Sequence, residues 1–365
     1  MSLGAYTEHD VVKWNAIAEY AASLVELEAA LPQLFTREGY EQFAGREGDK
    51  LTYRVRGRLP YRKYGFRNDR TVPIVFDEYE EATTDITWGG RIYQGARITD
   101  EQADFDLQNW EPILSAQAGA IAQGVIDDMA ETIEETPFAV TVGGAEAALR
   151  AAIVEARRVL NRFRVPGPRY LIVGSDFEAA MLNDKDLTLA QNVGDTRAEG
   201  ALSTAILGQH AGFTVVLDNT IEPDAAIAAV PTAFVQVSGA PGLPRGGVAA
   251  SVGSAAGTSV RWIADYSQNT FENRSTVDTY LGSNYVRDLF LPKSALAKTN
   301  APERIEMGDM VPHFVRAIKL TLGGESEYPE GAGMAGLIAE TGISQEKAWV
   351  APAAGGGAAD AGTGD

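Results

Sequence analysis

The stretch DFDLQNWEPILSAQAGAIAQGVIDDM, residues 104–129, decides the fold of this 365-residue chain more than any other segment. Its apolar residues recur every three or four positions, which is the spacing of one face of an α-helix. The pattern predicts a helix from Leu107 to Ile133, about 26 residues and about 40 Å long. That length is more than twice the average for helices in globular proteins. Pro112 marks either a kink in this helix or its first turn.

On the N-terminal side of this helix, the sequence predicts a shorter helix and then two strand pairs. Thr7 and Asp10 form a capping-box-like start, and apolar residues at helical spacing then continue until Pro32 ends the helix. Alternating apolar residues predict four strands. They are 51–55 and its return strand 72–76, joined by a tip at 59–70, and then 83–88 and 91–98, joined by Gly89-Gly90. The tip is too long for a tight turn and indicates a projecting arm.

On the C-terminal side, helices and strands alternate. A helix is predicted at 149–163, and a capping box at Ser175 and Glu178 begins another. The strands predicted beyond the long helix are 170–173, 214–217, 233–237, a strand from Ser259 through RWIADYS, and a return strand at 276–286. The final fifteen residues, APAAGGGAADAGTGD, are of low complexity, which predicts disorder.

Composition excludes several classes of function. The chain has no cysteine, which excludes disulfides, thiolate metal sites and a cysteine nucleophile. Its three histidines are far apart, and its formal net charge of -19 argues against nucleic-acid binding over a broad surface. No apolar run reaches the roughly 20 residues of a membrane helix, and no signal peptide is visible. We therefore expect a protein made in the cytoplasm that does not enter a membrane.

Catalytic motifs are not found, so we expect no enzyme, no cofactor and no metal. The glycine-rich segment GAPGLPRGG, residues 239–247, lacks the Lys-Ser/Thr ending of a phosphate-binding loop and is interpreted as a surface loop. Asp127 and Asp128 point about 100° apart on a helix and so do not form a shared carboxylate site. His210 lies in a turn bounded by glycines and is interpreted as structural, because no catalytic partner is evident.

The projecting arm concentrates positive charge in an acidic chain, because seven basic residues stand between Arg54 and Arg70 against one acid, Asp69. It also carries aromatic residues, and an acidic stretch follows it directly. We interpret the arm as a surface that docks on another copy of the chain, with a solvated loop and a site for single-stranded nucleic acid as alternatives. The candidate interface residues are Arg54, Arg56, Arg58, Tyr61, Arg62, Lys63, Tyr64, Arg67 and Arg70 on the arm, and the possible acidic partners are Asp77, Glu78, Glu80, Glu81 and Asp85.

The order of these parts resembles the major capsid proteins of tailed double-stranded-DNA phages, the Hong Kong 97 type, in the branch without a fused scaffold. EGDKLTYRVRGRLPYR (47–62) looks like the family's entry to its extended loop, and residues 104–129 look like its spine helix. GFTVVLDN (212–219) resembles a strand of the axial domain. SVRWIADYSQNTFENRSTVDTYLGSNYV (259–286), with Asp278-x-Tyr280-x-Gly282, resembles the closing strands of the peripheral domain.

The resemblance implies an α+β fold of defined parts: an N-terminal arm, an extended β-hairpin loop, a peripheral domain with the spine helix and a β-sheet, and an axial domain whose central sheet is flanked by helices. The expected boundaries are 1–47 for the arm, 48–82 for the loop, 83–136 with 255–290 for the peripheral domain, 137–254 for the axial domain, and 291–365 for a C-terminal extension.

The resemblance also implies a function. The chain would be the structural protein of the virion capsid, assembling in the bacterial host cytoplasm into pentamers and hexamers of an icosahedral shell. Packaged DNA would lie inside without sequence-specific binding. Implied partners are a separate scaffolding protein, a portal protein and decoration proteins. The alternatives are an encapsulin-like nanocompartment shell, a single-stranded nucleic-acid-binding protein that uses the basic arm, and a hydrolase with a carboxylate pair.

Overall fold

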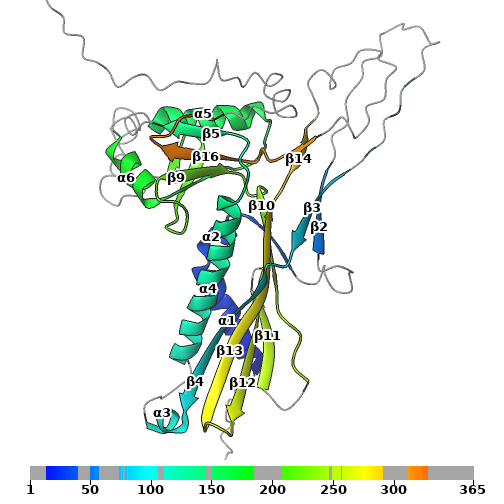
Figure 1. Ribbon diagram of the computed structural model, residues 1–365, viewed down its shortest axis with the longest axis vertical. Helices are drawn as coiled ribbons and strands as arrows, with labels where there is room; N and C mark the ends of the chain where they lie inside the picture. The colour runs from blue at the N-terminus through cyan, green and yellow to red at the C-terminus, as the bar shows by residue number, and fades with distance from the viewer. Residues whose placement is uncertain are drawn as a thin grey trace, which may run out of the picture. The chain divides into compact units, whose positions relative to one another are not determined.

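The protein is described here by a computed structural model (Figure 1). The structure describes residues 14–39, 50–56, 74, 76, 79, 81–105, 111–144, 149–184, 208–245, 249–255, 257–290 and 311–327. The chain divides into two compact units, each built from three separate segments. Unit 1 comprises Met1–Thr52, Asp85–Ile133 and Phe234–Asn284, and unit 2 comprises Tyr53–Thr84, Glu134–Ala233 and Tyr285–Asp365.

Unit 1 is built on a six-stranded sheet whose strands come from distant parts of the sequence. The order is β1-β10-β13-β12-β11, and β4 pairs with the long strand β13. β1 pairs with β10 in parallel, whereas β4 and β12 pair with β13 antiparallel, as β11 does with β12. The strands are β1 (Thr36–Gly39), β4 (Gly90–Thr99), β10 (Phe234–Gly239), β11 (Ala249–Ala255), β12 (Thr258–Ser267) and β13 (Glu272–Tyr285).

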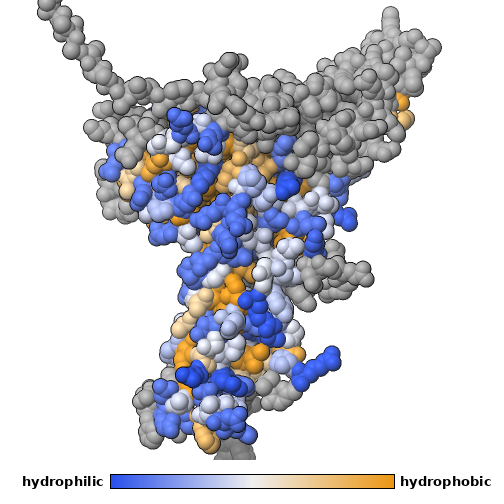
Figure 2. Space-filling model, viewed as in Figure 1, coloured by the Kyte–Doolittle hydropathy of each residue, from blue (hydrophilic) through white to orange (hydrophobic). Residues whose placement is uncertain are grey.

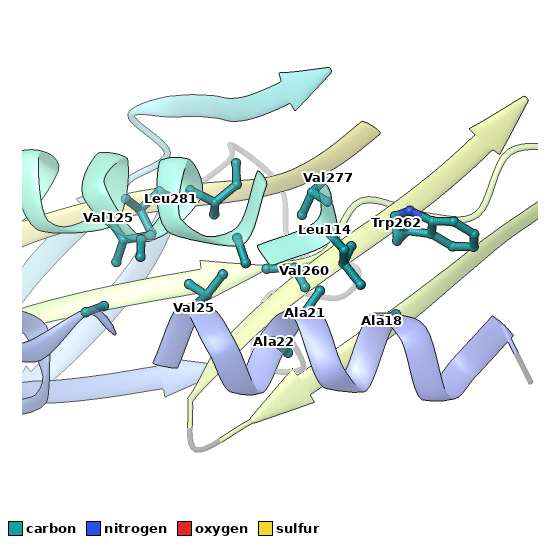
Figure 3. Close-up of a cluster of buried hydrophobic side chains, with 14 residues drawn as sticks. Ala18, Ala21, Ala22, Val25, Leu114, Val125, Val260, Trp262, Val277 and Leu281 are labelled. Carbon is teal, nitrogen blue, oxygen red and sulfur yellow. The ribbon is translucent and has the colours of Figure 1, made fainter. Parts of the chain in front are cut away.

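Two helices cover one face of this sheet, as Figure 3 shows. They are α1 (Trp14–Glu28) and α4 (Glu111–Glu134), and two short helices, α2 (Ala30–Gln33) and α3 (Asp100–Phe105), precede β1 and α4. Small residues of α1, among them Ala18, Ala21 and Ala22, pack with Ile121 and Val125 of α4, and the sheet adds its own apolar side chains to this core. Because alanine is short, α1 can lie close to the sheet; a Cβ on Gly253 of β11 would meet the backbone of Ala18 at 2.2 Å.

The predicted long helix is confirmed as α4. It begins at Glu111, so Pro112 lies in its first turn, where the missing amide hydrogen costs nothing. Leu107 and Trp110, which the pattern had included, lie outside the described residues. The N-terminal helix is confirmed as α1, but Pro32 does not end it: α1 ends at Glu28, and Pro32 is part of α2. Its predicted cap residues, Thr7 and Asp10, also lie outside the described residues.

Unit 2 is built on a second six-stranded sheet, in the order β5-β16-β9-β6-β8-β7. Helix α5 (Leu149–Arg162) packs along β5 and β16, and helix α6 (Ser175–Asn183) contacts β9. The central strands β6 and β9 are almost entirely buried. The strands are β5 (Thr141–Gly144), β16 (Ala317–Leu322), β9 (Ala225–Ala229), β6 (Tyr170–Val173), β8 (Phe213–Leu217) and β7 (Gln209–His210).

Two small sheets complete the described strands: β2 (Lys50–Val55) with β3 (Ala82–Thr87), and β14 (Asp288–Phe290) with β15 (Val311–His313). The predicted return strand at 72–76 is wrong, because Ile74 and Phe76 do not lie in a strand and the partner of β2 is β3. The hairpin predicted across Gly89-Gly90 is also wrong, since β4 pairs with β13. Alternation identifies a strand but carries no information about its partner.

Two further expectations need correction, and the C-terminal extension receives a place in the fold. Residues 234–254 were expected in the axial domain, but β10 and β11 lie in the sheet of unit 1. The extension 291–365 was left without a place, yet β16 is an inner strand of the sheet of unit 2, between β5 and β9. The predicted capping box of α6 is not formed, because its N-cap is Gly174. The last fifteen residues lie outside the described residues.

Candidate assembly surface

Most of the predicted arm lies outside the described residues. This holds for Arg58, Tyr61, Arg62, Lys63, Tyr64, Arg67 and Arg70, and also for the acidic residues Asp77, Glu78 and Glu80. At the base of the arm, Arg54 and Arg56 are exposed at the end of β2. The Arg54 Nη1 atom lies 3.9 Å from Glu81 Oε2, and Thr52 Oγ1 donates to Asp85 Oδ1 at 2.9 Å. The structure thus brings one predicted cation and one predicted acid together within a single copy.

Apolar residues are exposed on the segment that leads back from the arm. Ile74 is 69% exposed, Phe76 is 76% exposed and Tyr79 is 52% exposed. Exposed apolar side chains of this size are candidates for a contact with another protein. The alternation of Ile74 and Phe76 predicted a strand, but alternation alone does not show which face of a segment is buried.

A motif on β13 joins strands of the sheet of unit 1. Asp278 is buried and receives two hydrogen bonds from Arg261 of β12, Nε to Oδ1 at 3.0 Å and Nη2 to Oδ2 at 2.6 Å. Arg91 of β4 approaches the same carboxylate, with Nε 3.3 Å from Oδ2. One acid therefore joins three strands, and the two-pronged geometry fixes the Arg261 side chain in place.

Tyr280 and Gly282 extend this motif toward the end of β3. The guanidinium of Arg91 lies 5.1 Å from the centre of the Tyr280 ring, and the Trp88 ring lies 5.9 Å from it. A Cβ on Gly282 would lie 2.5 Å from the carbonyl oxygen of Thr87, so only glycine permits this approach of β3 to β13. Backbone and side-chain bonds add to it: Gly89 N donates to Leu281 O at 2.8 Å, and Asn284 Nδ2 donates to Asp85 O at 2.8 Å.

Helix α4 is joined to the sheet of unit 1 by buried polar groups as well as by apolar packing. Gln117 donates to the carbonyl of Ser275 at 2.9 Å and accepts from its hydroxyl at 2.8 Å. Trp262 Nε1 donates to the same hydroxyl at 2.9 Å. Further along the helix, Gln236 Nε2 donates to the carbonyl of Val125 at 3.1 Å. Because every one of these bonds needs a particular geometry, they fix the position of α4 along the sheet.

Asp128 lies near the C-terminal end of α4 and accepts a hydrogen bond from Ser283 Oγ at 2.6 Å. Burial raises the pKa of the Asp128 carboxyl above its ordinary value, and hydrogen bonds from Ser283 and Gln236 oppose that rise. Its neighbour Asp127 is exposed and bonds with Gln123. The two carboxylates therefore have separate surroundings, as the helical geometry predicts.

Two candidates from the sequence remain, the glycine-rich segment 239–247 and His210, and both belong to ordinary elements of the fold. The loop after β10 holds Gly242, whose carbonyl accepts from Arg261 Nη1 at 2.5 Å, and β11 follows it where a phosphate-binding loop would have a helix. His210 is a residue of β7. The residues that the structure describes contain no group of three or more potential metal ligands. Among them, too, no helix has the length and apolar character to cross a lipid bilayer.

Comparison with known proteins places this geometry in a family. Residues 90–282, from β4 to the Gly282 of the β13 motif, match the family described as "Phage capsid protein". This match spans more than half of the chain. A search of curated proteins finds no match.

Solved structures share the fold at low sequence identity. One described as "Mycobacterium phage Che8" is 17% identical, with a TM-score of 0.53, over 88% of this chain and 94% of its own. The capsid structure of the Cyanophage P-SCSP1u is 11% identical, with a TM-score of 0.56, over 80% and 87%. The capsid of a native GTA particle is 11% identical, with a TM-score of 0.51, over 89% and 95%. The chain therefore belongs to the phage capsid protein family and is a structural major capsid protein of a phage virion.

Proposed function

We propose that the arm between β2 and β3 is the contact by which one copy of this capsid protein binds its neighbour in the shell. The observation that carries the proposal is the exposure of three large apolar residues, Ile74, Phe76 and Tyr79, on the segment that leads from the arm into β3. Apolar area supplies the attraction in such a contact, and the basic residues of the arm give it direction toward an acidic surface.

The acidic stretch 77–85 of a neighbouring copy is the proposed partner of the basic residues. Glu81 has 36% of its side chain exposed and lies 3.9 Å from Arg54, so this pair is weak enough to exchange for a contact with another copy. Such exchange would offset part of the repulsion between copies that each carry a net charge of -19.

The shell that we propose is icosahedral and built from pentamers and hexamers, with double-stranded DNA inside. A separate scaffolding protein, a portal protein and decoration proteins complete the proposed partners, and assembly takes place in the bacterial cytoplasm. We propose no enzymatic activity, since the role of the chain is mechanical. An acidic protein suits this role because it leaves packaged phosphates mobile.

Charge reversal in the arm tests the proposal. We expect the variant Arg58→Glu, Arg62→Glu, Lys63→Glu to fold as the wild type but not to form closed shells in electron micrographs. A matched control reverses three exposed arginines elsewhere, Arg97→Glu, Arg245→Glu and Arg287→Glu, so that the net charge changes equally. Normal shells from the arm variant, or equal loss in both variants, would contradict the proposal. Wild-type particles that contain a cargo enzyme and no DNA would instead support a nanocompartment.

A further inference from the structure

Unit 2 carries a second basic segment, apart from the arm. Residues 157–169 contain five arginines and no acidic residue, in a chain where acids greatly outnumber bases. They belong to the last turns of α5 and to the connection into β6. The five are Arg157, Arg158, Arg162, Arg164 and Arg169. The segment was visible in the sequence as a run of charge, but its meaning depends on where the sheet places it.

Two of these arginines are held in place by neutral groups. Arg157 Nη1 donates to the carbonyl of Ala211 at 2.7 Å. Arg169 Nη2 donates to Asn161 Oδ1 at 2.8 Å and to the carbonyl of Val165 at 3.1 Å. Burial, followed by the positive charge of Arg157, lowers the pKa of Arg169, so the two cations lie near enough to repel each other. Each is thus oriented, and its charge is not neutralised by a carboxylate of the described residues.

The other arginines of the segment differ in what they bind. Arg158 forms two hydrogen bonds with Glu155, at 2.7 and 2.6 Å, and so is paired within the chain. Arg162 and Arg164 are exposed, and neither side chain has a hydrogen bond or an ion pair with any residue that the structure describes. They are positive groups available to a partner. We call Arg157, Arg162, Arg164 and Arg169 the cationic end of unit 2.

The opposite end of the same sheet is acidic. Strand β6 begins after Arg169 and ends before Gly174, and the loops at this second end carry the carboxylates. Gly174 N donates to the carbonyl of Ala225, and its own surroundings include the carbonyls of Glu222 and Pro223, so these loops lie together. We call Asp176, Glu178, Asp218, Glu222 and Asp224 the anionic end. Among the described residues, Lys319 and Arg150 are basic exceptions on this side; Lys319 is paired with Glu222.

The cationic end and the anionic end lie at opposite ends of the strands of one sheet. Four residues of a strand span roughly 13 Å. Tyr170 of β6 pairs with Thr214 and Ala229 at the cationic end, and Val173 pairs with Leu217 and Ala226 at the anionic end. Figure 2 shows many hydrophilic residues on the visible surface of unit 2, interrupted by a hydrophobic patch. Asp288 also lies at the cationic end, beside Val230, but it is paired with Arg316. Along β6, β8 and β9, unit 2 is therefore polarised, with unpaired arginines at one end and exposed carboxylates at the other.

We propose that the cationic end of unit 2 in one copy binds the anionic end of unit 2 in the next copy, head to tail. A symmetric two-fold contact through either end would bring like charges together, whereas a head-to-tail contact pairs opposite charges at every step. Contacts of this heterologous kind close into rings when the rotation between copies is right. The inference rests on the proposed self-assembly, and it names a contact that is separate from the arm.

The experiment reverses charge at the cationic end and then restores the pairing. The first variant is Arg162→Glu, Arg164→Glu, at two exposed side chains that the fold does not use. The second is Asp176→Lys, Asp224→Lys at the exposed part of the anionic end. The third combines all four changes, which reverses both ends. A control, Arg97→Glu, Arg150→Glu, changes the net charge as the first variant does, but adds its negative charges in unit 1 and at the anionic end.

Ring formation is measured by native mass spectrometry and analytical ultracentrifugation, with circular dichroism as the check that each chain is folded. We expect each of the first two variants to need a protein concentration at least about tenfold higher than the wild type to form rings. The variant with all four substitutions and the control should form rings at protein concentrations within about threefold of the wild type. The proposal would be overturned if the first variant formed rings as readily as the wild type does. It would also be overturned if ring formation were not restored in the variant with all four substitutions.

The same measurements separate this inference from the proposed function. If the wild type forms no assembly, the proposed self-assembly fails. If the wild type and the first variant assemble alike, only the contact between unit 2 ends fails. A filter-binding measurement with single-stranded and double-stranded DNA completes the test: binding that the first variant loses while its rings persist would assign the cationic end to nucleic acid and overturn the proposal.

Discussion

At Asp278 two arginines from different strands meet one buried carboxylate. Arg261 and Asp278 are 8% and 2% exposed, so both charges are largely removed from water and depend on each other. Removal of one partner from such a pair leaves a buried charge without compensation, which costs far more than the loss of a surface pair. The connection between β4, β12 and β13 thus depends on a single buried residue.

We expect Asp278→Asn to lower the free energy of unfolding by about 3 kcal/mol or more. The matched control is Asp265→Asn, because Asp265 also receives two hydrogen bonds from an arginine of the same sheet, at 3.0 and 2.7 Å from Arg274, but in an exposed position. The control should cost ~1 kcal/mol or less. Urea denaturation of the unassembled chains measures the free energy of unfolding of both variants. Equal decreases would contradict the explanation that burial makes the Asp278 pair more important than the exposed Asp265 pair.

At the scale of the element, helix α4 carries a partly buried carboxyl group, that of Asp128, whose protonation affects stability. The folded-state pKa of Asp128 is raised by burial, so the folded protein holds this proton more tightly than the unfolded chain does. The stability from this group is therefore fully present below the unfolded-state pKa and is lost as pH rises through the folded-state pKa. At neutral pH the ionised carboxylate works against the packing of α4.

We expect Asp128→Asn to raise the melting temperature at pH 7, because the amide cannot ionise and its oxygen still accepts from Ser283. The gain should shrink as the pH falls from 7 to 4, since the wild type then becomes protonated. The control Asp127→Asn removes a carboxylate from the exposed neighbour on the same turn and should raise the melting temperature less at pH 7 than Asp128→Asn does. Melting curves at several pH values decide; a gain for Asp128→Asn that does not vary with pH would contradict the explanation.

The helices could be predicted from the sequence because their signal is local. The apolar spacing that predicts α4 and α5 lies within each helix, and only the exact ends were missed. Strand partners are different: β13 pairs with β4, nearly two hundred residues earlier, and β16 fills a place between β5 and β9. Nothing within the six residues of β16 states that position, so the extension 291–365 could not be placed.

The β13 motif and the cationic end of unit 2 show the same limit at the level of sites. Asp278, Tyr280 and Gly282 stood out as a motif, but the partners that explain it, Arg91 and Thr87, become neighbours only when β4 and β3 reach β13. The run of arginines in 157–169 can be read directly from the sequence. Their opposition to the carboxylates of 218–224 depends on the register of β6 with β8 and β9, which no local pattern contains.

At the scale of the whole molecule, positive charge is concentrated and negative charge is spread. The segments 54–70 and 157–169 hold twelve of the 31 lysines and arginines, against 50 acids throughout the chain. Copies with a net charge of -19 repel one another at long range, and salt reduces that repulsion over a Debye length of about 8 Å in physiological solution. Concentrated cations oppose it only where a copy arrives in the right orientation, so charge distribution selects the geometry of assembly.

Head-to-tail pairing has a consequence for the number of copies in a ring. A chain with Arg162→Glu, Arg164→Glu repels its own kind, as does a chain with Asp176→Lys, Asp224→Lys, but each end of one still matches the opposite end of the other. An equal mixture should therefore form rings in which the two chains alternate, and an alternating ring must have an even number of members.

We expect native mass spectrometry of the mixture to show even-numbered rings with both chains in equal amounts, whereas wild-type rings are free to be odd or even. Odd-numbered mixed rings would contradict the pairing, because at least one junction in such a ring must join two chains of the same kind. Since a five-fold vertex needs an odd ring, the mixture should also fail to close an icosahedral shell that the wild type closes.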